Sequence, residues 1–272
     1  MSSGGRLQDQ VAWISGAASG IGEGVARLFA REGAAVALVD VQAAKGLAAA
    51  DHIRAQGGRA IFIESDVGQE TGVRTSIEQT VREFGRLHIL VNCAGIVQVK
   101  LLHELEEADW NRLMDINVKS IFLSVKHGMA HLKKNPRSYI VNIGSVGSFI
   151  GQSSTPAYIA SKGAVLMLSK SIALDYAADG VRCNCVCPGI TDTPMLREHL
   201  NATADPEATL RGRLRRVPMA VPMTPQHIAK AVLYFSCEDS AGVTGTSLVI
   251  DGGYLAAAEW EQAGKTRFMD AL

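Results

Sequence analysis

Residues 15–22 read Ser-Gly-Ala-Ala-Ser-Gly-Ile-Gly and join a short apolar run to an amphipathic stretch. The glycines Gly16, Gly20 and Gly22 have the spacing G-x-x-x-G-x-G. Glycine permits a tight turn and a close backbone approach, and the N-terminus of a following helix offers free N–H groups to a pyrophosphate. Because 27 of the 272 residues are glycine, the loop by itself is also compatible with simple strand–helix packing. Its place after the first predicted strand favours a phosphate-binding loop.

Short β-branched runs alternate with longer amphipathic stretches along the chain. The predicted strands are residues 11–15, 35–40, 60–65, 88–92, 139–145, 181–187 and 247–250. The predicted helices are residues 21–31, 42–55, 70–84, 106–115, 118–133, 155–178, 195–216 and 225–237. Nearly all-apolar strands that alternate with helices indicate a parallel sheet covered on both faces. We therefore expect an α/β fold, a doubly wound Rossmann-type sheet in a single domain, residues 1–272. A substrate lid is expected at about 190–224 and a C-terminal tail at 255–272.

Composition limits the classes of partner. The formal net charge is zero, which argues against nucleic acid or an anionic membrane. The chain has no run of eighteen or more apolar residues and no apolar segment near its start, so we expect neither a transmembrane helix nor a signal peptide. The five cysteines lack the spacing of a disulfide framework. A cytoplasmic protein is the expectation.

Asp40 closes the second predicted strand, eighteen residues after Gly22. A carboxylate at this place accepts hydrogen bonds from both hydroxyls of an adenosine ribose and repels a 2′-phosphate. Val41 follows Asp40, and the loop carries Ser19 where a cation would favour that phosphate. The sequence therefore predicts dinucleotide binding, with NAD preferred over NADP.

Tyr158 and Lys162 lie four residues apart in a predicted helix and therefore share one face. A free tyrosine has a pKa of about 10, and a nearby cation favours its anion. Ionising the phenol near neutral pH costs about 4 kcal/mol, more than an exposed pair supplies. A catalytic pair thus requires a partly desolvated site that contains the cofactor's charge. Otherwise the two residues belong to the surface of an amphipathic helix.

Ser145 ends the preceding predicted strand, thirteen residues before Tyr158. A hydroxyl, an ionisable phenol and an ammonium at one sheet edge suit proton transfer to a carbonyl oxygen while a hydride moves. The competing interpretation is that Ser145 is an acyl-transfer nucleophile. Ile143 stands where the G-x-S-x-G elbow needs glycine, so that interpretation fails the local test.

Together these motifs resemble the short-chain dehydrogenase/reductase family over nearly the whole chain, residues 11–254. SGAASGIG is similar to the family's TGxxxGxG cofactor loop, with Ser15 in place of Thr. NCAG, residues 92–95, is similar to the family's NNAG, with Cys93 at the second place. PGITDTPM, residues 188–195, resembles the loop that holds the nicotinamide.

The resemblance implies both a cofactor site and a catalytic tetrad. The implied cofactor-binding residues are Ser15, Gly16, Ser19, Gly20, Ile21, Gly22, Asp40, Asp66, Val67, Asn92, Ala94, Gly95, Tyr158, Lys162, Pro188, Gly189, Thr191 and Thr193. The implied catalytic residues are Asn117, Ser145, Tyr158 and Lys162. By this resemblance Tyr158 exchanges the proton at the substrate oxygen, which Ser145 polarises. Lys162 lowers the pKa of Tyr158 and holds the nicotinamide ribose, and Asn117 holds a water that links Lys162 to solvent.

We therefore expect an NAD-dependent oxidoreductase that interconverts a secondary alcohol (polyol, sugar-derived or cyclic) and its ketone. One alternative is an NADPH-dependent 3-oxoacyl-carrier-protein reductase, which Asp40 argues against. The other is a non-catalytic dinucleotide-sensing protein of the same fold, which the complete tetrad argues against. Candidate substrate residues near the tetrad are Val97, Gly147 and Gln152. Their apolar neighbours favour an uncharged substrate, and the basic cluster in the lid favours an anion. That cluster consists of Arg211, Arg213, Arg215 and Arg216, and a solvated helix face is the favoured interpretation of it.

Two other features have mainly structural interpretations. Cys183, Cys185 and Cys187 alternate along a predicted strand, so their thiols share one face. The spacing is not that of a usual metal site, and we expect no metal. The tail carries Trp260 and Phe268, which need a surface to bury them. Similar family members are commonly homotetramers, and we expect the same here.

Overall fold

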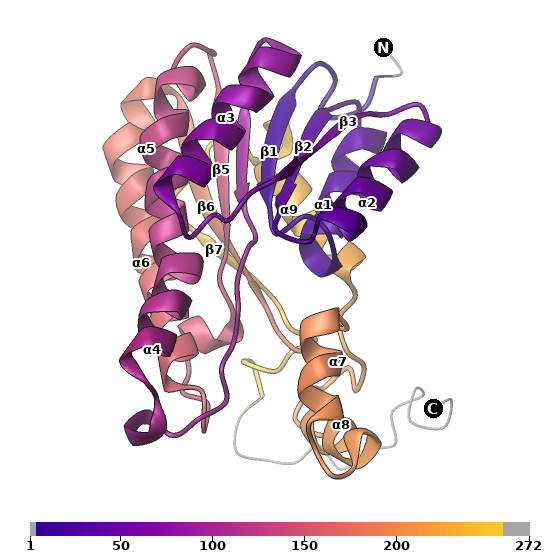
Figure 1. Ribbon diagram of the computed structural model, residues 1–272, viewed down its shortest axis with the longest axis vertical. Helices are drawn as coiled ribbons and strands as arrows, with labels where there is room; N and C mark the ends of the chain where they lie inside the picture. Colours follow the sequence, from indigo (N-terminus) through magenta and orange to yellow (C-terminus); the bar gives the residue numbers. More distant parts are fainter. Residues whose placement is uncertain (1–3, 258–272) are drawn as a thin grey trace.

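Seven strands form one parallel sheet in the order β3-β2-β1-β4-β5-β6-β7 (Figure 1). The structure is a computed structural model, and it describes residues 4–257. The strands are β1 (Val11–Ser15), β2 (Ala35–Asp40), β3 (Arg59–Glu64), β4 (Ile89–Asn92), β5 (Ser138–Ile143), β6 (Val181–Pro188) and β7 (Ser247–Ile250). Strand order reverses at β1, which has β2 on one side and β4 on the other. The predicted doubly wound sheet is confirmed, and such sheets bind ligands beyond the carboxyl ends of their strands at this reversal.

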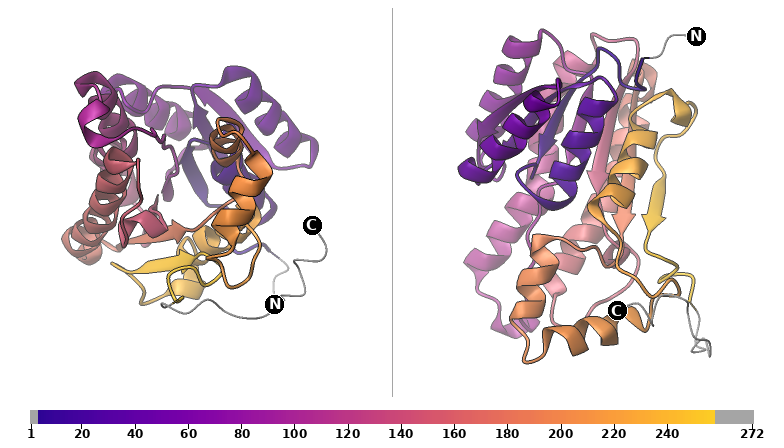
Figure 2. Two further views of the ribbon diagram at one scale, coloured as in Figure 1. Left: turned by 90° about the horizontal axis from the view of Figure 1, so that it is seen from below. Right: turned by 90° about the vertical axis from the view of Figure 1, so that its right-hand side faces the viewer.

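Helices cover both faces of the sheet (Figures 1 and 2). One face packs on α1 (Gly20–Arg31), α2 (Ala43–Ala55) and α9 (Pro225–Phe235). The other packs on α3 (Glu70–Phe84), α5 (Ser120–Leu132) and α6 (Pro156–Tyr176). Successive side chains of a strand point to opposite faces. Ala12 and Ile14 accordingly join the first layer, and Trp13 joins the second.

Shorter elements lie beyond the carboxyl ends of the strands (Figure 1). There α4 (Glu107–Met114) lies at the lower left, and α7 (Pro194–Asn201) with α8 (Pro206–Leu214) lies at the lower right.

Two predictions about these segments are wrong. Residues 106–133 do not form two separate helices, because a π-helical turn, η2 (Asp115–Lys119), joins α4 to α5 without a break. Residues 195–216 are not one helix, because Pro206 begins α8 behind an Asp205 N-cap.

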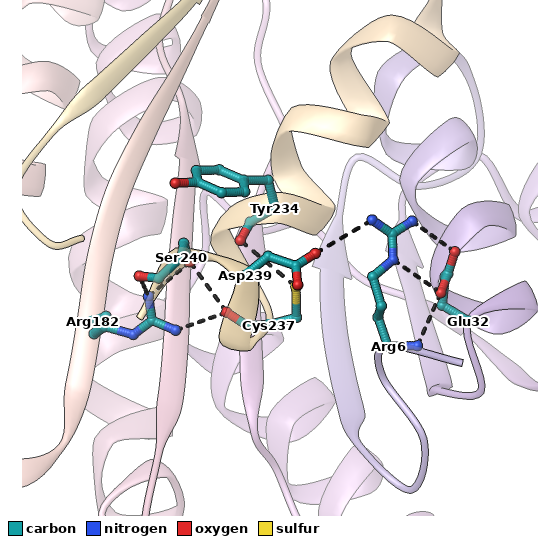
Figure 3. A network of polar contacts seen from close by, with 7 residues as sticks. All are labelled: Arg6, Glu32, Arg182, Tyr234, Cys237, Asp239 and Ser240. Carbon is teal, nitrogen blue, oxygen red and sulfur yellow. Dashed lines mark hydrogen bonds and ion pairs between the residues drawn. The ribbon is translucent and has the colours of Figure 1, made fainter. Parts of the chain in front are cut away.

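A polar network ties the chain together at the opposite, amino end of the sheet (Figure 3). Arg6, just before β1, donates to the Glu32 carboxylate at 3.2 and 2.9 Å and lies 3.6 Å from the Asp239 carboxylate. Arg182, at the start of β6, donates to the carbonyl oxygen of Cys237 at 2.9 Å. These contacts join the segment before β1 to the end of α1, and the start of β6 to the segment after α9, on the side away from the ligand-binding edge.

Helix α6 is apolar over much of its length. Within residues 4–257, Pro156–Asp179 is long and apolar enough to cross a membrane by length and composition, with a mean hydropathy of 1.2 over its best window. The core helices of soluble proteins pass the same test. One face of α6 packs on β5 and β6, and its apolar character assigns no membrane span.

Candidate active site

The glycine-rich loop makes its tight turn between β1 and α1. Gly16 and Gly20 have φ angles of 65° and 59°, a region that side chains disfavour. A Cβ atom on Gly16 would lie 2.7 Å from the Cα of Ala94. A Cβ atom on Gly22 would lie 2.2 Å from the carbonyl oxygen of Gly16. Only glycine fits at 16 and 22, and the loop that results packs against the segment after β4.

Ser15 joins the same two segments through its side chain. Its Oγ accepts hydrogen bonds from the backbone N–H groups of Cys93 and Ala94, at 3.1 and 3.2 Å. The residue is 1% exposed. Its hydroxyl therefore fixes the residues that follow β4, and contact with a cofactor stays a prediction for Ser15.

A cavity of about 280 Å³ lies where the glycine-rich loop meets the start of α7. Its lining includes Ser19, Gly20, Arg27, Thr193, Arg197 and Pro225. Ser19, Thr193 and the residue before Pro225 are the N-caps of α1, α7 and α9, so three helix N-termini face this space. The partial positive charge at these ends suits phosphate groups. Glu23 and Asp192 also line the cavity, paired with Arg27 and Arg197, and binding of a dinucleotide diphosphate there stays a prediction.

Two carboxylates at the ends of β2 and β3 are held by backbone N–H groups. The Oδ2 and Oδ1 of Asp40 accept from Ala18 and Gln42 at 3.1 and 3.0 Å. The Oδ1 of Asp66 accepts from Gly68 at 2.9 Å, beside the buried Val67. A carboxylate oxygen accepts more than one hydrogen bond, so Asp40 keeps acceptor capacity for ribose hydroxyls.

Asn117 lies in the π-helical turn η2 and is 2% exposed. Turns of this kind recur at functional sites. Its Oδ1 accepts from the N–H of Ile96 at 2.8 Å. Its Nδ2 donates to the carbonyl oxygen of Ile96 and to the Oγ of Ser161, both at 3.0 Å. Both side-chain N–H groups are thus used, and the predicted water link would need the second lone pair of Oδ1 or the main chain.

Tyr158 and Lys162 lie one turn apart on α6, as predicted from their spacing. Lys162 is 5% exposed, and its Nζ donates to the carbonyl oxygen of Ile143 at 2.8 Å. The same Nζ lies 5.6 Å from the centroid of the Tyr158 ring. A Cβ atom on Gly95 would lie 3.6 Å from this Nζ and 3.5 Å from the Oδ1 of Asn117. Asn117 and Lys162 therefore meet beside Gly95.

Ser145 follows β5 and is the N-cap of a short 3-10 helix, η3 (Val146–Ser148). Its Oγ accepts from the N–H of Gly147 at 3.0 Å, which fixes the hydroxyl. Its own N–H donates to the Oγ of Ser148 at 3.2 Å. The sequence interpretation missed Ser148 and Ser161, because serine in a loop or helix follows no periodic pattern.

The predicted nicotinamide loop follows β6 and leads into α7. The Oγ1 of Thr191 donates to the carbonyl oxygen of Gly189 at 3.0 Å, next to Pro188. The Oγ1 of Thr193 accepts from the N–H of Leu196 at 3.3 Å and caps α7. A Cβ atom on Gly20 would lie 3.5 Å from the Cβ of Thr193. The loop therefore borders the glycine-rich turn, as a shared ligand requires.

The three predicted substrate residues differ in their surroundings. Val97 is partly buried, Gly147 is buried and Gln152 is exposed. The place of a side chain on Gly147 is taken by Ile159, whose Cδ1 would lie 2.6 Å from a Cβ there. The backbone N–H of Lys100 donates to the carbonyl oxygen of Ser154 at 2.8 Å, joining the segments after β4 and before α6.

Two of the four arginines of the lid, Arg211 and Arg216, have partners within the described residues. Arg211 lies 3.2 Å from the Glu207 carboxylate. The guanidinium of Arg216 lies 5.0 Å from the ring centroid of Tyr254. These contacts weaken the case for an anion site built from the whole cluster.

All five cysteines are free, and Cys183, Cys185 and Cys187 are buried in the layer of α6. The Sγ atoms of Cys185 and Cys187 lie 3.6 Å apart. Burial raises the pKa of the Cys93 thiol to about 12, so this neighbour of the loop is a poor nucleophile. Residues 4–257 contain no group of three His, Cys, Asp or Glu residues placed to hold a metal. Trp260 and Phe268 lie outside the described residues.

Comparison with known proteins adds independent information. A family model described as enoyl-(acyl carrier protein) reductase matches residues 16–255. The chain is 38% identical to cis-4-hydroxycyclohexanecarboxylate dehydrogenase from Sinomonas cyclohexanicum, over 91% of this chain and 97% of that protein. It is 36% identical to cyclopentanol dehydrogenase from Comamonas sp., over 93% and 99% of the two chains.

A solved structure described as a short-chain dehydrogenase/reductase from Burkholderia xenovorans superposes with a TM-score of 0.90. The two proteins share 32% sequence identity, and the match covers 94% of this chain and 100% of the other. The chain belongs to the short-chain dehydrogenase/reductase family and is an oxidoreductase with a nicotinamide dinucleotide as cofactor.

Proposed function

We propose that the protein interconverts a secondary alcohol and its ketone with NAD as the redox cofactor. The observation that carries the proposal is the position of Tyr158 and Lys162 at the carboxyl edge of the sheet. The Lys162 Nζ is buried and 5.6 Å from the Tyr158 ring. Ser145 follows the carboxyl end of β5, at the same edge of the sheet. The proposal brings a phenol, an ammonium and a fixed hydroxyl to one substrate oxygen.

In the direction of oxidation, the Tyr158 phenolate removes the hydroxyl proton of the alcohol. The buried ammonium of Lys162 stabilises that phenolate by its charge. The Ser145 hydroxyl donates a hydrogen bond to the substrate oxygen and holds it near Tyr158. A bound nicotinamide would supply the hydride acceptor for this oxidation. Asn117 anchors the segment after β4 through Ile96 and so supports the wall of the site.

The preference for NAD rests on Asp40. Asp40 is 9% exposed at the end of β2, and its carboxylate accepts a hydrogen bond from Ala18 in the glycine-rich loop. A buried anion at this position accepts hydrogen bonds from ribose hydroxyls, and it repels a 2′-phosphate. Asp66 and Val67 follow β3 at the same edge and form the wall for the adenine.

For the substrate we propose a neutral cyclic secondary alcohol. Several large apolar side chains are exposed in segments that follow the carboxyl ends of β4, β5 and β6. They are Val99, Leu101, Leu102, Phe149, Met195 and Met219. Contact with such side chains favours apolar ligands. The two relatives named above act, by their names, on ring alcohols. One of these alcohols also carries a carboxylate, so the relatives support a ring substrate, and its neutrality rests on the apolar side chains alone.

We also propose a cytoplasmic homotetramer without a nucleic-acid or membrane partner. The net charge of zero and the family's common assembly support this. Size-exclusion chromatography with light scattering tests it, and a monomer or dimer at micromolar concentration would exclude the tetramer.

The test of function is NADH formation with a panel of cyclic alcohols, polyols and sugar acids, with NAD⁺ and NADP⁺ in parallel. We expect turnover of cyclic alcohols with NAD⁺. Turnover of a 3-oxoacyl carrier-protein substrate with NADPH instead would establish the reductase alternative. NADH binding with no turnover of any substrate would favour a dinucleotide-sensing protein.

A further inference from the structure

The side chain of Ser148 connects two residues of the predicted tetrad. Its Oγ accepts a hydrogen bond from the N–H of Ser145 at 3.2 Å. The same Oγ donates to the carbonyl oxygen of Lys162 at 2.7 Å. One hydroxyl thus joins the backbone after β5 to the backbone of α6, fourteen residues away along the chain.

Lys162 is consequently held at both of its ends by one short segment. Its ammonium donates to the carbonyl oxygen of Ile143 at 2.8 Å, and its carbonyl oxygen accepts from Ser148. Ser145 lies between Ile143 and Ser148 in the sequence, and its Oγ is fixed by the N–H of Gly147 at 3.0 Å. The Ser145 residue is therefore restrained at its nitrogen and at its hydroxyl.

The space around Ser148 is small. A Cβ atom on Gly144 would lie 3.1 Å from the Oγ of Ser148. Phe149 and Ile150 both donate their N–H groups to the carbonyl oxygen of Val146, at 3.0 and 3.3 Å. The turn that carries Ser148 is therefore closed by its own backbone bonds, and the Oγ has little freedom to choose other partners.

We propose that Ser148 is a positioning residue for the reaction, and this inference rests on the proposed function. Ser145 and Tyr158 must reach the same substrate oxygen, yet they come from different elements, η3 and α6. The Ser148 hydroxyl sets the distance between these elements through its hydrogen bonds to Ser145 and to Lys162. Misplacement of reacting groups by about 1 Å costs on the order of 100-fold in rate.

A purely structural role for Ser148, as a cap of η3, predicts different behaviour. Loss of a cap on an isolated turn lowers stability and loosens cofactor and substrate binding together. Loss of a positioning bond lowers kcat while the binding of NADH is retained.

The experiment compares Ser148→Ala with Ser171→Ala, a matched control at an exposed position of α6. For each purified full-length variant, kcat and KM are measured with the best alcohol, together with the NADH Kd by fluorescence and the pH profile of kcat/KM. We expect Ser148→Ala to lose roughly 10- to 100-fold in kcat. Its KM and NADH Kd should stay within about 3-fold of the parent values, and Ser171→Ala should match the parent protein. Parent-like kcat in Ser148→Ala, or an equal loss in NADH affinity, overturns the proposal.

A second measurement does not depend on turnover. Hydrogen exchange of a peptide covering residues 144–150 reports the Ser145 N–H, which Ser148 protects. Faster exchange there in Ser148→Ala supports the link, and unchanged exchange overturns it even if no substrate is found. Tyr158→Phe distinguishes a failure of the proposed function from a failure of the role proposed for Ser148. If that variant keeps parent turnover, the proposed function fails, whereas parent turnover in Ser148→Ala alone removes only the role of Ser148.

Discussion

The side-chain amides of Asn92 and Asn142 form a hydrogen bond of 2.8 Å across the neighbouring strands β4 and β5. The two residues are 4% and 0% exposed. The Oγ of Ser124, on α5, donates to Asn92 at 2.8 Å, and the Nδ2 of Asn142 donates to the Oγ of Ser169, on α6, at 2.9 Å. This buried chain links α5 and α6 through β4 and β5, and Asn142 precedes Ile143, whose carbonyl oxygen accepts from Lys162.

Asn142→Leu is expected to destabilise the protein by about 2–4 kcal/mol, because it leaves the buried Asn92 amide without its acceptor. Urea unfolding followed by circular dichroism measures the loss. The exposed Asn111→Leu on α4 is the control and should stay within about 0.5 kcal/mol of the parent. Equal stability of the two variants would show that the buried chain contributes little.

Tyr158→Phe is expected to lower turnover by about 10²- to 10⁴-fold, because the ring stays and only the proton-transferring hydroxyl is lost. NADH should still bind, since the cavity at the glycine-rich loop contains no part of this side chain. Steady-state kinetics and NADH fluorescence check the two statements. Tyr176→Phe, at the end of the same helix, provides the comparison and should turn over normally.

The fold was predictable because its signals are local. Nearly all-apolar strands and the glycines at 16 and 22 are dictated by burial and close packing, and the strand bounds agree within two residues. The α4–α5 junction was not predictable. Residues 114–120 contain neither Gly nor Pro to mark an end, and the π-helical turn that places Asn117 arises from tertiary contacts with Ile96 and Ser161.

The candidate residues of the site were recognisable in the sequence, and the hydrogen bonds that hold these residues in place were not. Tyr158 and Lys162 are recognisable by helical spacing, and Asp40 by its place at the end of a strand. The hydroxyl of Ser148 acts between backbones fourteen residues apart, and no pattern in one sequence encodes such a contact. His227 is another support that no sequence pattern indicates. In the structure its Nδ1 accepts from the N–H of Thr224 at 3.2 Å, which completes the N-terminal cap of α9.

Asp40→Asn is expected to weaken NADH binding by roughly 10-fold, because charge-assisted hydrogen bonds to the ribose become neutral ones. The same change removes the repulsion of a 2′-phosphate, so the ratio of NADPH to NADH affinity should rise. Fluorescence titration with both cofactors measures the ratio. Asp51→Asn on the exposed face of α2 should leave it unchanged. An unaltered ratio in Asp40→Asn would remove the basis for the NAD preference.

Acid should destabilise the protein through His88. Its Nδ1 accepts from the N–H of Val11 at 3.0 Å, and burial lowers the pKa of His88 below its usual value. As the pH falls, the unfolded chain therefore binds a proton at His88 before the folded chain does, near pH 6.5. The stabilising contribution is fully present above that pH and is lost as the pH falls below it.

For a single group the slope is at most about 1.4 kcal/mol per pH unit. His88→Asn keeps an acceptor beside Val11 and removes the titration, so its stability should change less between pH 7 and pH 5. The exposed His103→Asn should keep the parent slope. Unfolding midpoints at several pH values decide between these outcomes, and equal slopes in all three proteins would exclude His88 as the cause.

Gly144→Ala is expected to disturb the site from within the core. The new Cβ would lie 2.8 Å from the Sγ atoms of both Cys185 and Cys187. Both cysteines are fully buried, so their side chains cannot move aside into solvent. Overpacking of this kind costs about 1–3 kcal/mol. Because Gly144 precedes Ser145, part of the strain should displace Ser145 and lower kcat as well as the melting temperature.

Gly151→Ala is the matched control for this effect. A Cβ there meets nothing within 4 Å, and the variant should resemble the parent in both measurements. The double variant Gly144→Ala with Cys185→Ala removes one of the two clashing sulfurs. It should recover part of the loss in a double-mutant cycle, since the two positions are in contact. Strictly additive effects would mean that the clash with Cys185 is not the source of the damage, and that the backbone at Gly144 accommodates a side chain in another way.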